Sequence, residues 1–537
     1  MRMRALAMAL TVLLTVSMAL PVAAATVPPS ASPKLIVALA IDQLSADLFA
    51  AYRGRFTGGF ARLAEGAVFP SGFQGHASTE TCPDHATILT GARPARSGII
   101  ANAWSDPRLK RDEKTVYCVE DENASGPGQI ISPVHLRVPT LGDRLKAVNA
   151  ATRVVAVSGK DRSAVVMAGK KPDEIWWYSR GQFVSYAGVK TPAAVIEANA
   201  HLTKTVDSPR APFALPDVCR PYDVAVQIEP MREVGQNRLG RAAKEPARFQ
   251  ASPDADEAVV ALALGLVNDM KLGQGPAPDI LALGLSATDY VGHTYGTRGA
   301  EMCIQLLAVD QMVGKLLAGL DAANIDYVVA FTADHGGQDV PERNRGHGAP
   351  DSHRVDGTLP AATVGAEIGK QMKLPGPVLY GEPYGVGDFW IDTKLTDAQR
   401  AEVLKRALAF YRSHPDVYAA LSREEILATP MPKSPPDEWS VIERVRASYD
   451  PQRSGDFYVV IKPRISAYEI SSRPYTAGHG TPWDYDRRVP IIFWRKGMTG
   501  FEQPFAVETV DIMPTLAAMI GLKVPPGEVD GRCLFGC

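Results

Sequence analysis

The chain has 537 residues, of which 46% are apolar and 22% charged, and its formal net charge is -2. This composition is that of an ordinary globular protein, long enough for one large α/β domain or for two or three smaller ones. The near-neutral charge gives no overall basic footprint for nucleic acid, so no nucleic-acid partner is expected.

Residues 1–25 have the pattern of a secretory signal peptide. Arg2 and Arg4 precede an apolar run at 5–20, and the alanines at 23–25 offer a small-residue cleavage site. The run is shorter than the roughly 20 residues that a membrane-spanning helix needs. We therefore predict cleavage and export to the periplasm or medium, with no stable membrane anchor.

Six cysteines are compatible with disulfides in an exported protein. Cys533 and Cys537 are close enough in sequence to close a small loop, and Cys118 is a candidate partner for Cys219. Cys303 lies in an apolar helical stretch and is expected to be a core residue. Sequence alone does not fix the connectivity.

Apolar runs alternate with helical patterns along the chain. The runs predict strands at 35–41, 153–158, 279–285, 327–331, 458–461 and 489–494, and the clearest helices are expected at 254–271, 301–322 and 397–412. This alternation predicts an α/β fold with a mostly parallel sheet sandwiched by helices. Residues 26–537 are expected to form one domain. Its Pro-, Gly- and charge-rich segments, roughly 103–150, 170–250 and 340–475, are expected to be cap insertions around a cleft.

Polar residues follow four of these runs directly. In open α/β sheets, ligands bind beyond the carboxyl ends of the strands, so residues far apart in the chain meet at one edge. The residues concerned are Asp42 after the first run, Lys160 and Arg162 after the second, Asp289 and His293 after the third, and Asp334 and His335 after the fourth.

Several of these residues are of the types that bind zinc. Zinc prefers imidazole nitrogen and carboxylate oxygen in four-coordinate sites. Asp289 and His293 are four residues apart, Asp334 and His335 are adjacent, and His479 lies between two glycines. Each pattern alone is weak, because such pairs are usually caps or surface contacts. Their joint placement after buried strands predicts a metal centre.

Thr81 is the candidate nucleophile. Pro83 suits the first turn of a helix, which places Thr81 at the N-terminus of that helix. Free amides and the helix dipole there stabilise an alkoxide and a phosphoryl group, and metal coordination can activate a hydroxyl. From this segment alone, a plain capping role for Thr81 is the stronger reading. His85 is expected to orient the nucleophile or to cap the helix.

Over nearly all of the mature chain, the sequence resembles the alkaline phosphatase superfamily, in the branch of PafA-type alkaline phosphatases and nucleotide pyrophosphatase/phosphodiesterases. The blocks that carry the resemblance are 41–43, 79–91, 158–162, 289–293, 332–336, 478–480, 510–516 and 530–532.

The resemblance implies two zinc ions and a role for each matching residue. One zinc would be held by Asp289, His293 and His479, and the other by Asp42, Thr81, Asp334 and His335. Thr81 would be the nucleophile and would carry a phosphothreonine intermediate, while Lys160, Arg162 and Asn102 would bind the phosphate oxygens. Manganese or iron could occupy related sites.

The resemblance also points to the substrate class. A Lys/Arg pair with Asn102 suits the dianion of a phosphate monoester, so we expect an alkaline phosphatase acting on small phosphate esters. A phosphodiesterase or nucleotide pyrophosphatase on the same scaffold, a sulfatase-like enzyme and a non-catalytic zinc-binding secreted protein are the alternatives. Asp84 departs from the Gly or Asn that the family has at this position, which puts catalytic strength in doubt. The oligomeric state is left open.

Overall fold

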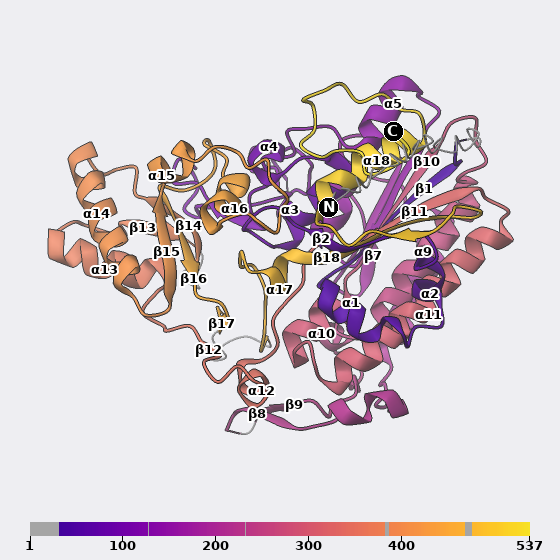
Figure 1. Cartoon of the computed structure of the whole chain (residues 1–537), viewed down its shortest axis with the longest axis horizontal. Coiled ribbons are helices and arrows are strands. Elements are labelled where there is room, and N and C mark those ends of the chain that lie inside the picture. Colours follow the sequence, from indigo (N-terminus) through magenta and orange to yellow (C-terminus); the bar gives the residue numbers. More distant parts are fainter. Residues whose placement is uncertain (1–31, 127, 231, 382–385, 468–474) are drawn as a thin grey trace, which may run out of the picture. The chain divides into compact units, whose positions relative to one another are not determined.

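The computed structural model describes residues 32–537, apart from 127, 231, 382–385 and 468–474. The predicted signal peptide at 1–25 lies outside these residues. Within residues 33–537, a large sheet has helices on both faces, and a smaller sheet stands apart from it (Figure 1). The α/β fold expected from the alternating runs is confirmed.

The large sheet has ten strands within the described residues. Their order is β19 (Phe501–Glu502), β2 (Ala67–Phe73), β18 (Arg488–Arg495), β11 (Tyr327–Thr332), β1 (Leu35–Ile41), β10 (Asp279–Leu285), β5 (Val154–Ser158), β6 (Glu174–Ser179) and β7 (Gln182–Val184), with β20 (Val507–Glu508) beside β2. The central strands β11, β1, β10, β5 and β6 are parallel, whereas β18 runs antiparallel to both β11 and β2. The sheet is therefore mixed, with a parallel centre.

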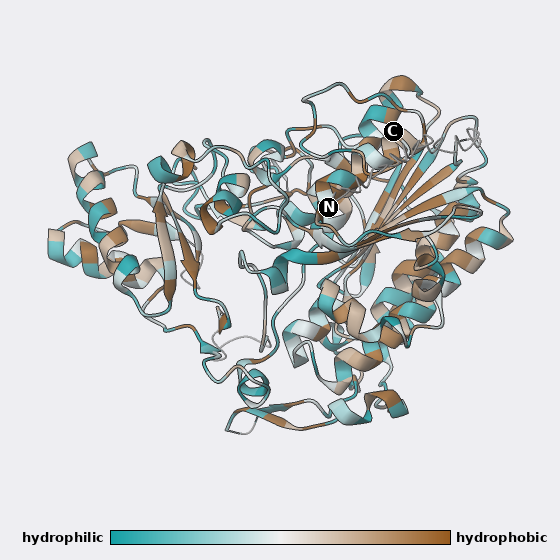
Figure 2. Ribbon diagram, in the orientation of Figure 1, coloured by the Kyte–Doolittle hydropathy of each residue, from teal (hydrophilic) through white to brown (hydrophobic). Residues whose placement is uncertain are grey.

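Strand β1 shows why the sheet is covered on both faces. All seven of its residues are buried, and alternate side chains enter different clusters, because successive residues of a strand point to opposite faces. Leu35, Val37 and Leu39 enter one cluster, while Ile36 and Ala38 enter the other. The strands are accordingly coloured as apolar along most of their length in Figure 2.

Different helices supply the two clusters. The first face is covered by α1 (Ala46–Arg53), α2 (Gly59–Leu63), α7 (Ala193–Asp207), α9 (Pro253–Met270) and α11 (Ala300–Ala322), and the second by α3 (Thr81–Thr90), α5 (Leu141–Val148), α6 (Asp161–Ala168) and α18 (Ile512–Met519). Helix α11 is long and apolar enough to span a membrane, but most of it is buried inside the protein. Packing in the core thus accounts for its apolar sequence.

The smaller sheet has four strands, ordered β13 (Leu379–Gly381), β14 (Gly387–Ile391), β16 (Phe457–Ile461) and β15 (Val417–Ser422). Phe389, Ile391 and Phe457 pack with α13 (Ala361–Met372) and α14 (Asp397–Ser413) in a cluster of their own. The strand expected at 458–461 therefore exists, but it belongs to this sheet and not to the large one.

Three disulfides link all six cysteines, and two of them differ from the expected pattern. Cys82 is bonded to Cys118, and Cys219 to Cys303, so Cys118 does not pair with Cys219 and Cys303 is not a plain core thiol. The expected small loop between Cys533 and Cys537 is closed. The Cys219–Cys303 bond ties a short 3-10 turn to α11, a contact between distant segments that no local pattern reveals.

Candidate metal and phosphate-binding site

Three parallel strands bring the predicted carboxylates to one edge of the large sheet. Asp42 directly follows β1, and its backbone N–H donates to the carbonyl oxygen of Leu285 at the end of β10 (2.9 Å). Asp289 lies in the first turn of α10 (Ala287–Tyr295), just after β10, and Asp334 lies two residues beyond β11. The register of β1 with both neighbours makes these strand ends coincide.

Asp289, His335 and His479 form the first candidate metal group, with one potential ligand atom of each within 4.8 Å of the others. His293 belongs beside them, because its Nε2 atom lies 3.2 Å from Asp289 Oδ1. The Nδ1 atoms of His293, His335 and His479 each contact a backbone carbonyl oxygen, at 2.8, 2.9 and 2.7 Å. These contacts direct Nε2 of each ring toward the group, as expected for metal-binding imidazoles.

Asp42, Asp334 and His85 form the second group. His85 Nε2 lies 3.2 Å from Asp42 Oδ1, and its Nδ1 lies 2.9 Å from the Thr81 carbonyl oxygen. The sequence suggested only an orienting or capping role for His85; its position one helical turn after Thr81 is the signal that places both on one face of α3. His335 Nε2 is also 3.2 Å from Asp334 Oδ2, so this ring lies near both groups.

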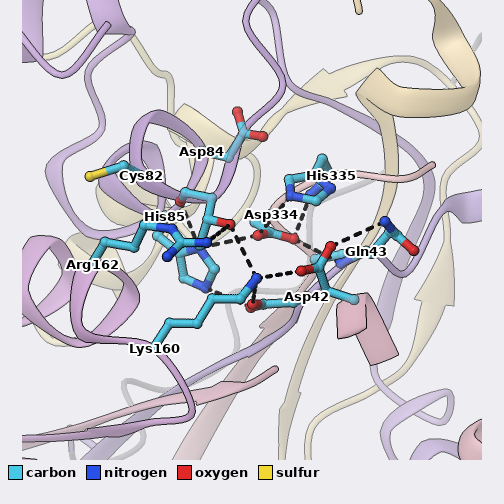
Figure 3. A network of polar contacts seen from close by, with 12 residues as sticks. Asp42, Gln43, Cys82, Asp84, His85, Lys160, Arg162, Asp334 and His335 are labelled. Carbon is cyan, nitrogen blue, oxygen red and sulfur yellow. Dashed lines mark hydrogen bonds and ion pairs between the residues drawn. The ribbon is translucent and has the colours of Figure 1, made fainter. Parts of the chain in front are cut away.

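Gln43 connects the two groups. Its backbone N–H donates to Asp334 Oδ1 (3.0 Å), and its side-chain amide donates to Asp289 Oδ1 (3.1 Å). The backbone of Gln43 has a positive φ of 61°, a conformation that is uncommon for a residue other than glycine. Gln43 therefore orients one carboxylate of each group, which Figure 3 shows in part.

The donor set fits bound cations. Both carboxylate oxygens of Asp42, Asp334 Oδ2, His85 Nε2 and His335 Nε2 are buried and make no hydrogen bond among the described residues, although each lies within ion-pair distance of another of these atoms or of Lys160. Such burial is costly unless a cation compensates. The Lys160 ammonium lies 2.8 Å from Asp42 Oδ2 and 2.6 Å from Asp289 Oδ2, which shows that this place favours positive charge. Imidazole and carboxylate together are the donors that zinc prefers.

The predicted phosphate-binding cations converge on Thr81. Thr81 begins α3 and is almost fully buried. Lys160 Nζ and Arg162 Nη2 each donate to Thr81 Oγ1 at 3.3 Å. Burial lowers the pKa of Lys160, but the Asp289 and Asp42 carboxylates outweigh this effect and raise the pKa above its ordinary value. The ammonium therefore stays charged at alkaline pH.

Asn102 is held against the start of α3. Its Oδ1 accepts a hydrogen bond from the Cys82 backbone N–H (2.8 Å), and its own backbone N–H donates to Glu80 Oε2 (2.6 Å). Because its carbonyl oxygen is occupied, the NH₂ group is the part of the side chain left to donate to a ligand. Asn102 lines the same cavity as Arg162 and His479.

A short hairpin connects the segment of Asn102 to the segment of Arg162. Its strands are β3 (Ala103–Ser105) and β4 (Thr115–Tyr117). Tyr117 Oη donates to Asp161 Oδ1 (2.6 Å), which also accepts from the Arg162 backbone N–H (2.8 Å). The next residue, Cys118, is bonded to Cys82. Sequence reasoning missed Tyr117, because nothing local links it to Asp161, 44 positions later.

Asp84 points away from the phosphate-binding groups (Figure 3). It is fully buried, and its Oδ1 lies 2.5 Å from Nε2 of the equally buried His76. Burial raises the pKa of Asp84 well above its usual range, with the Asp334 and Glu80 carboxylates adding to the rise. Burial also lowers the pKa of His76 to about 3. The Asp84 carboxyl is therefore paired with His76 and is directed away from the phosphate-binding groups.

The chain is similar to relatives of known name. The family model described as type I phosphodiesterase / nucleotide pyrophosphatase matches residues 36–483. Alkaline phosphatase PhoK of Sphingomonas sp. is 49% identical over 94% of this chain and 91% of its own, and alkaline phosphatase PhoD of Zymomonas mobilis is 44% identical over 94% and 88%.

A solved structure supports the fold. The crystal structure of alkaline phosphatase PafA superposes with a TM-score of 0.80 at 24% identity, covering 94% of this chain and 99% of its own. At this identity the likeness bears on the fold alone. The family model matches most of the chain, and two curated alkaline phosphatases are 49% and 44% identical to it. The chain therefore belongs to the type I phosphodiesterase / nucleotide pyrophosphatase family, among its alkaline phosphatases.

Proposed function

We propose that the protein is an exported alkaline phosphatase that hydrolyses phosphate monoesters with two zinc ions, through a phosphothreonine at Thr81. The observation that carries the proposal is the convergence of Lys160 and Arg162 on Thr81 Oγ1, at 3.3 Å each, between two groups of metal-type ligands. The names of the relatives support the phosphatase activity.

Asp289, His293 and His479 would hold one zinc, and Asp42, Thr81, Asp334 and His335 the other. When bound, the ions supply Lewis-acid stabilisation of charge on the reacting oxygens. His85 contacts Asp42 and the Thr81 backbone, so we assign it to positioning the second group and the nucleophile.

Thr81 Oγ1 is surrounded by donors. The Lys160 and Arg162 side chains donate to it, and the free N–H groups at the start of α3 favour negative charge beside it. These contacts favour the alkoxide over the hydroxyl. Oγ1 would attack phosphorus as the bond to the leaving alcohol oxygen breaks, and water would then attack phospho-Thr81, releasing phosphate and restoring the side chain.

Preference for monoesters follows from charge. A monoester dianion carries more negative charge on its free oxygens than a diester, and Lys160, Arg162 and the Asn102 amide are placed to bind those oxygens. Because Lys160 is buried and Arg162 is half-buried, their attraction for the dianion is screened less by solvent than that of exposed cations.

The first test compares p-nitrophenyl phosphate with bis-p-nitrophenyl phosphate at alkaline pH, with zinc added and then chelated. We expect a large, chelator-sensitive preference for the monoester. Thr81→Ala should lose turnover while retaining bound zinc, with Thr90→Ala as the control, since the Thr90 hydroxyl bonds to its own helix at Ala86. A preference for the diester would overturn the substrate class, and near-normal turnover by Thr81→Ala would remove the nucleophile assignment.

Export is a separate part of the proposal. The signal-peptide pattern at 1–25 and the three disulfides of the described chain both suit an oxidising compartment outside the cytoplasm. N-terminal sequencing of the protein recovered from expressing cells is expected to begin just after the alanines at 23–25. An intact Met1 in the active protein would contradict export by cleavage.

A further inference from the structure

The catalytic cavity has a second wall, whose side chains have no assigned part in the phosphate chemistry apart from Glu80, which accepts from the Asn102 backbone. The cavity has a volume of about 320 Å³. Metal-type ligands and Arg162 line its inner side, whereas Glu80, Asp388, Trp390 and Tyr458 line it from the start of α3 and from the smaller sheet. An ester whose phosphorus lies at Thr81 would place its alcohol part against this second wall.

The alternation of β14 and β16 directs these side chains toward the cavity. Asp388 and Tyr458 are directly paired across the two strands, and Phe389 is paired with Phe457. Phe389 and Phe457 stack at 4.9 Å inside the core of the smaller sheet. Because successive side chains point to opposite faces, Asp388, Trp390 and Tyr458 share the face that is turned to the catalytic site.

Among the described residues, the two carboxylates of this wall form no ion pair, and its tyrosine hydroxyl forms no hydrogen bond. Tyr458 is only 4% exposed, and the described residues provide no hydrogen bond to its hydroxyl, which lies at the cavity. Asp388 accepts from the Gly455 backbone N–H (2.8 Å) and from the Ser454 side chain, and Glu80 accepts from the Asn102 backbone N–H. Neither carboxylate pairs with a Lys or Arg side chain within the described residues.

The charges of the cavity differ between its two sides. Among its lining residues, Arg162 and Asp289 belong to the phosphate and metal groups, which leaves the two carboxylates Glu80 and Asp388 beside two aromatic rings. A neutral or anionic alcohol gains no charge compensation from such a wall. An ammonium group gains both the attraction of the carboxylates and cation–π contact with Trp390 and Tyr458.

We propose that this wall is a leaving-group subsite for alcohols that carry an ammonium group, so that amino-alcohol phosphates are preferred substrates. The proposal rests on the proposed phosphatase function and adds the substrate class. The small cavity volume agrees with a leaving group of a few heavy atoms. The Trp390 ring is held in place by the hydrogen bond from its Nε1 to the Arg453 carbonyl oxygen (3.1 Å), so the wall exists before any ligand arrives.

The test compares kcat/KM of the zinc-loaded protein for 2-aminoethyl phosphate, 2-(trimethylammonio)ethyl phosphate and the neutral 2-hydroxyethyl phosphate. We expect the two ammonium esters to be preferred by about tenfold. Asp388→Asn, which can still accept from Gly455, should bring the ratio close to one, and Trp390→Leu should lower it. The control is Asp437→Asn, because Asp437 is exposed and outside the cavity.

Binding to the metal-free protein separates this proposal from the phosphatase function. Isothermal titration calorimetry with choline is expected to show binding that Asp388→Asn weakens by about tenfold and that Asp437→Asn leaves unchanged. If the zinc-loaded protein shows no phosphatase activity but the metal-free protein binds choline, the proposed function is wrong and the subsite proposal stands. Equal kcat/KM values for charged and neutral esters, or a ratio that Asp388→Asn does not alter, would overturn the subsite.

Discussion

Replacing Tyr117 by Phe removes one hydroxyl that reaches the phosphate-binding groups through a neighbour. Tyr117 Oη donates to Asp161 Oδ1 at 2.6 Å, and the same oxygen accepts the Arg162 backbone N–H. Burial raises the pKa of Tyr117 above its ordinary value, so the hydroxyl remains a donor at the alkaline pH of the assay. Arg162 in turn reaches Thr81 Oγ1 at 3.3 Å.

The size of the effect follows from the loss of one hydrogen bond to a charged acceptor. Such bonds contribute about 1.5–3 kcal/mol, and only part of this loss is transmitted to Arg162. We therefore expect kcat/KM for p-nitrophenyl phosphate to fall about tenfold, which corresponds to about 1.4 kcal/mol. Because Lys160 and Arg162 are proposed to bind the additional negative charge of the monoester, kcat/KM for bis-p-nitrophenyl phosphate should change by no more than about twofold.

A matched control distinguishes positioning from general loss of stability. Tyr186 carries a buried hydroxyl that has no hydrogen-bond partner among the described residues, so Tyr186→Phe removes the same atom without breaking a bond. We expect this variant to keep the monoester-to-diester ratio of the wild type. An equal fall for both esters in Tyr117→Phe, or no fall for either, would refute the assignment of Tyr117 as a positioning residue.

Four further outcomes are expected. Chelation of zinc should lower the calorimetric unfolding temperature by removing about 4 kcal/mol of stabilisation if the metal is present at a thousand times its Kd, and an unchanged temperature would argue against bound metal. Asp84→Asn should keep kcat/KM within about threefold, since the Asp84 side chain is directed away from the phosphate-binding groups. Asp84→Ala, which leaves His76 without its partner, should lower the free energy of unfolding measured in urea by about 1–3 kcal/mol. Replacing Cys82 and Cys118 by Ser should lower stability by about 3–4 kcal/mol for a loop of this length, measured against the wild type under the same oxidising conditions. Burial raises the pKa of Asp388 to about 7, and the Asp388 carboxyl faces the ionisable groups of Glu80, Tyr449 and Tyr458. The preference for ammonium esters should therefore grow as the pH rises from 6 to 8 and ionises Asp388. A ratio of kcat/KM values for charged and neutral esters that does not change with pH would contradict the role of Asp388.

The centre of the fold could be predicted because its signals are local. The runs that became β1, β10 and β11 are continuous and apolar, as strands buried on both faces must be, and the polar residues that follow them mark the sheet edge. The expected helices at 254–271, 301–322 and 397–412 correspond closely to α9, α11 and α14. The proximity of Asp42 to Asp289 follows from parallel pairing alone.

The remaining features depend on contacts between distant segments, which a single sequence does not encode visibly. The strand at 458–461 was expected from its composition, but its membership of the smaller sheet depends on pairing with β14, seventy residues earlier. The Cys82–Cys118 bond and the Tyr117 contact both depend on where the hairpin folds back. The proximity of His335 to both metal groups likewise depends on side-chain orientation, which adjacency to Asp334 does not fix.

The smaller sheet has a consequence for how relatives can diverge. The groups that would carry out bond cleavage follow the strands of the large sheet, whereas Asp388, Trp390 and Tyr458 come from β14 and β16 of the smaller sheet, whose other face packs in its own hydrophobic cluster. Mutations in that unit can change which alcohol is recognised while leaving the reactive centre intact. Grafting the segment between β13 and β16 from one relative to another is therefore a direct route to transplanting selectivity, and natural variation among these enzymes is expected to concentrate there.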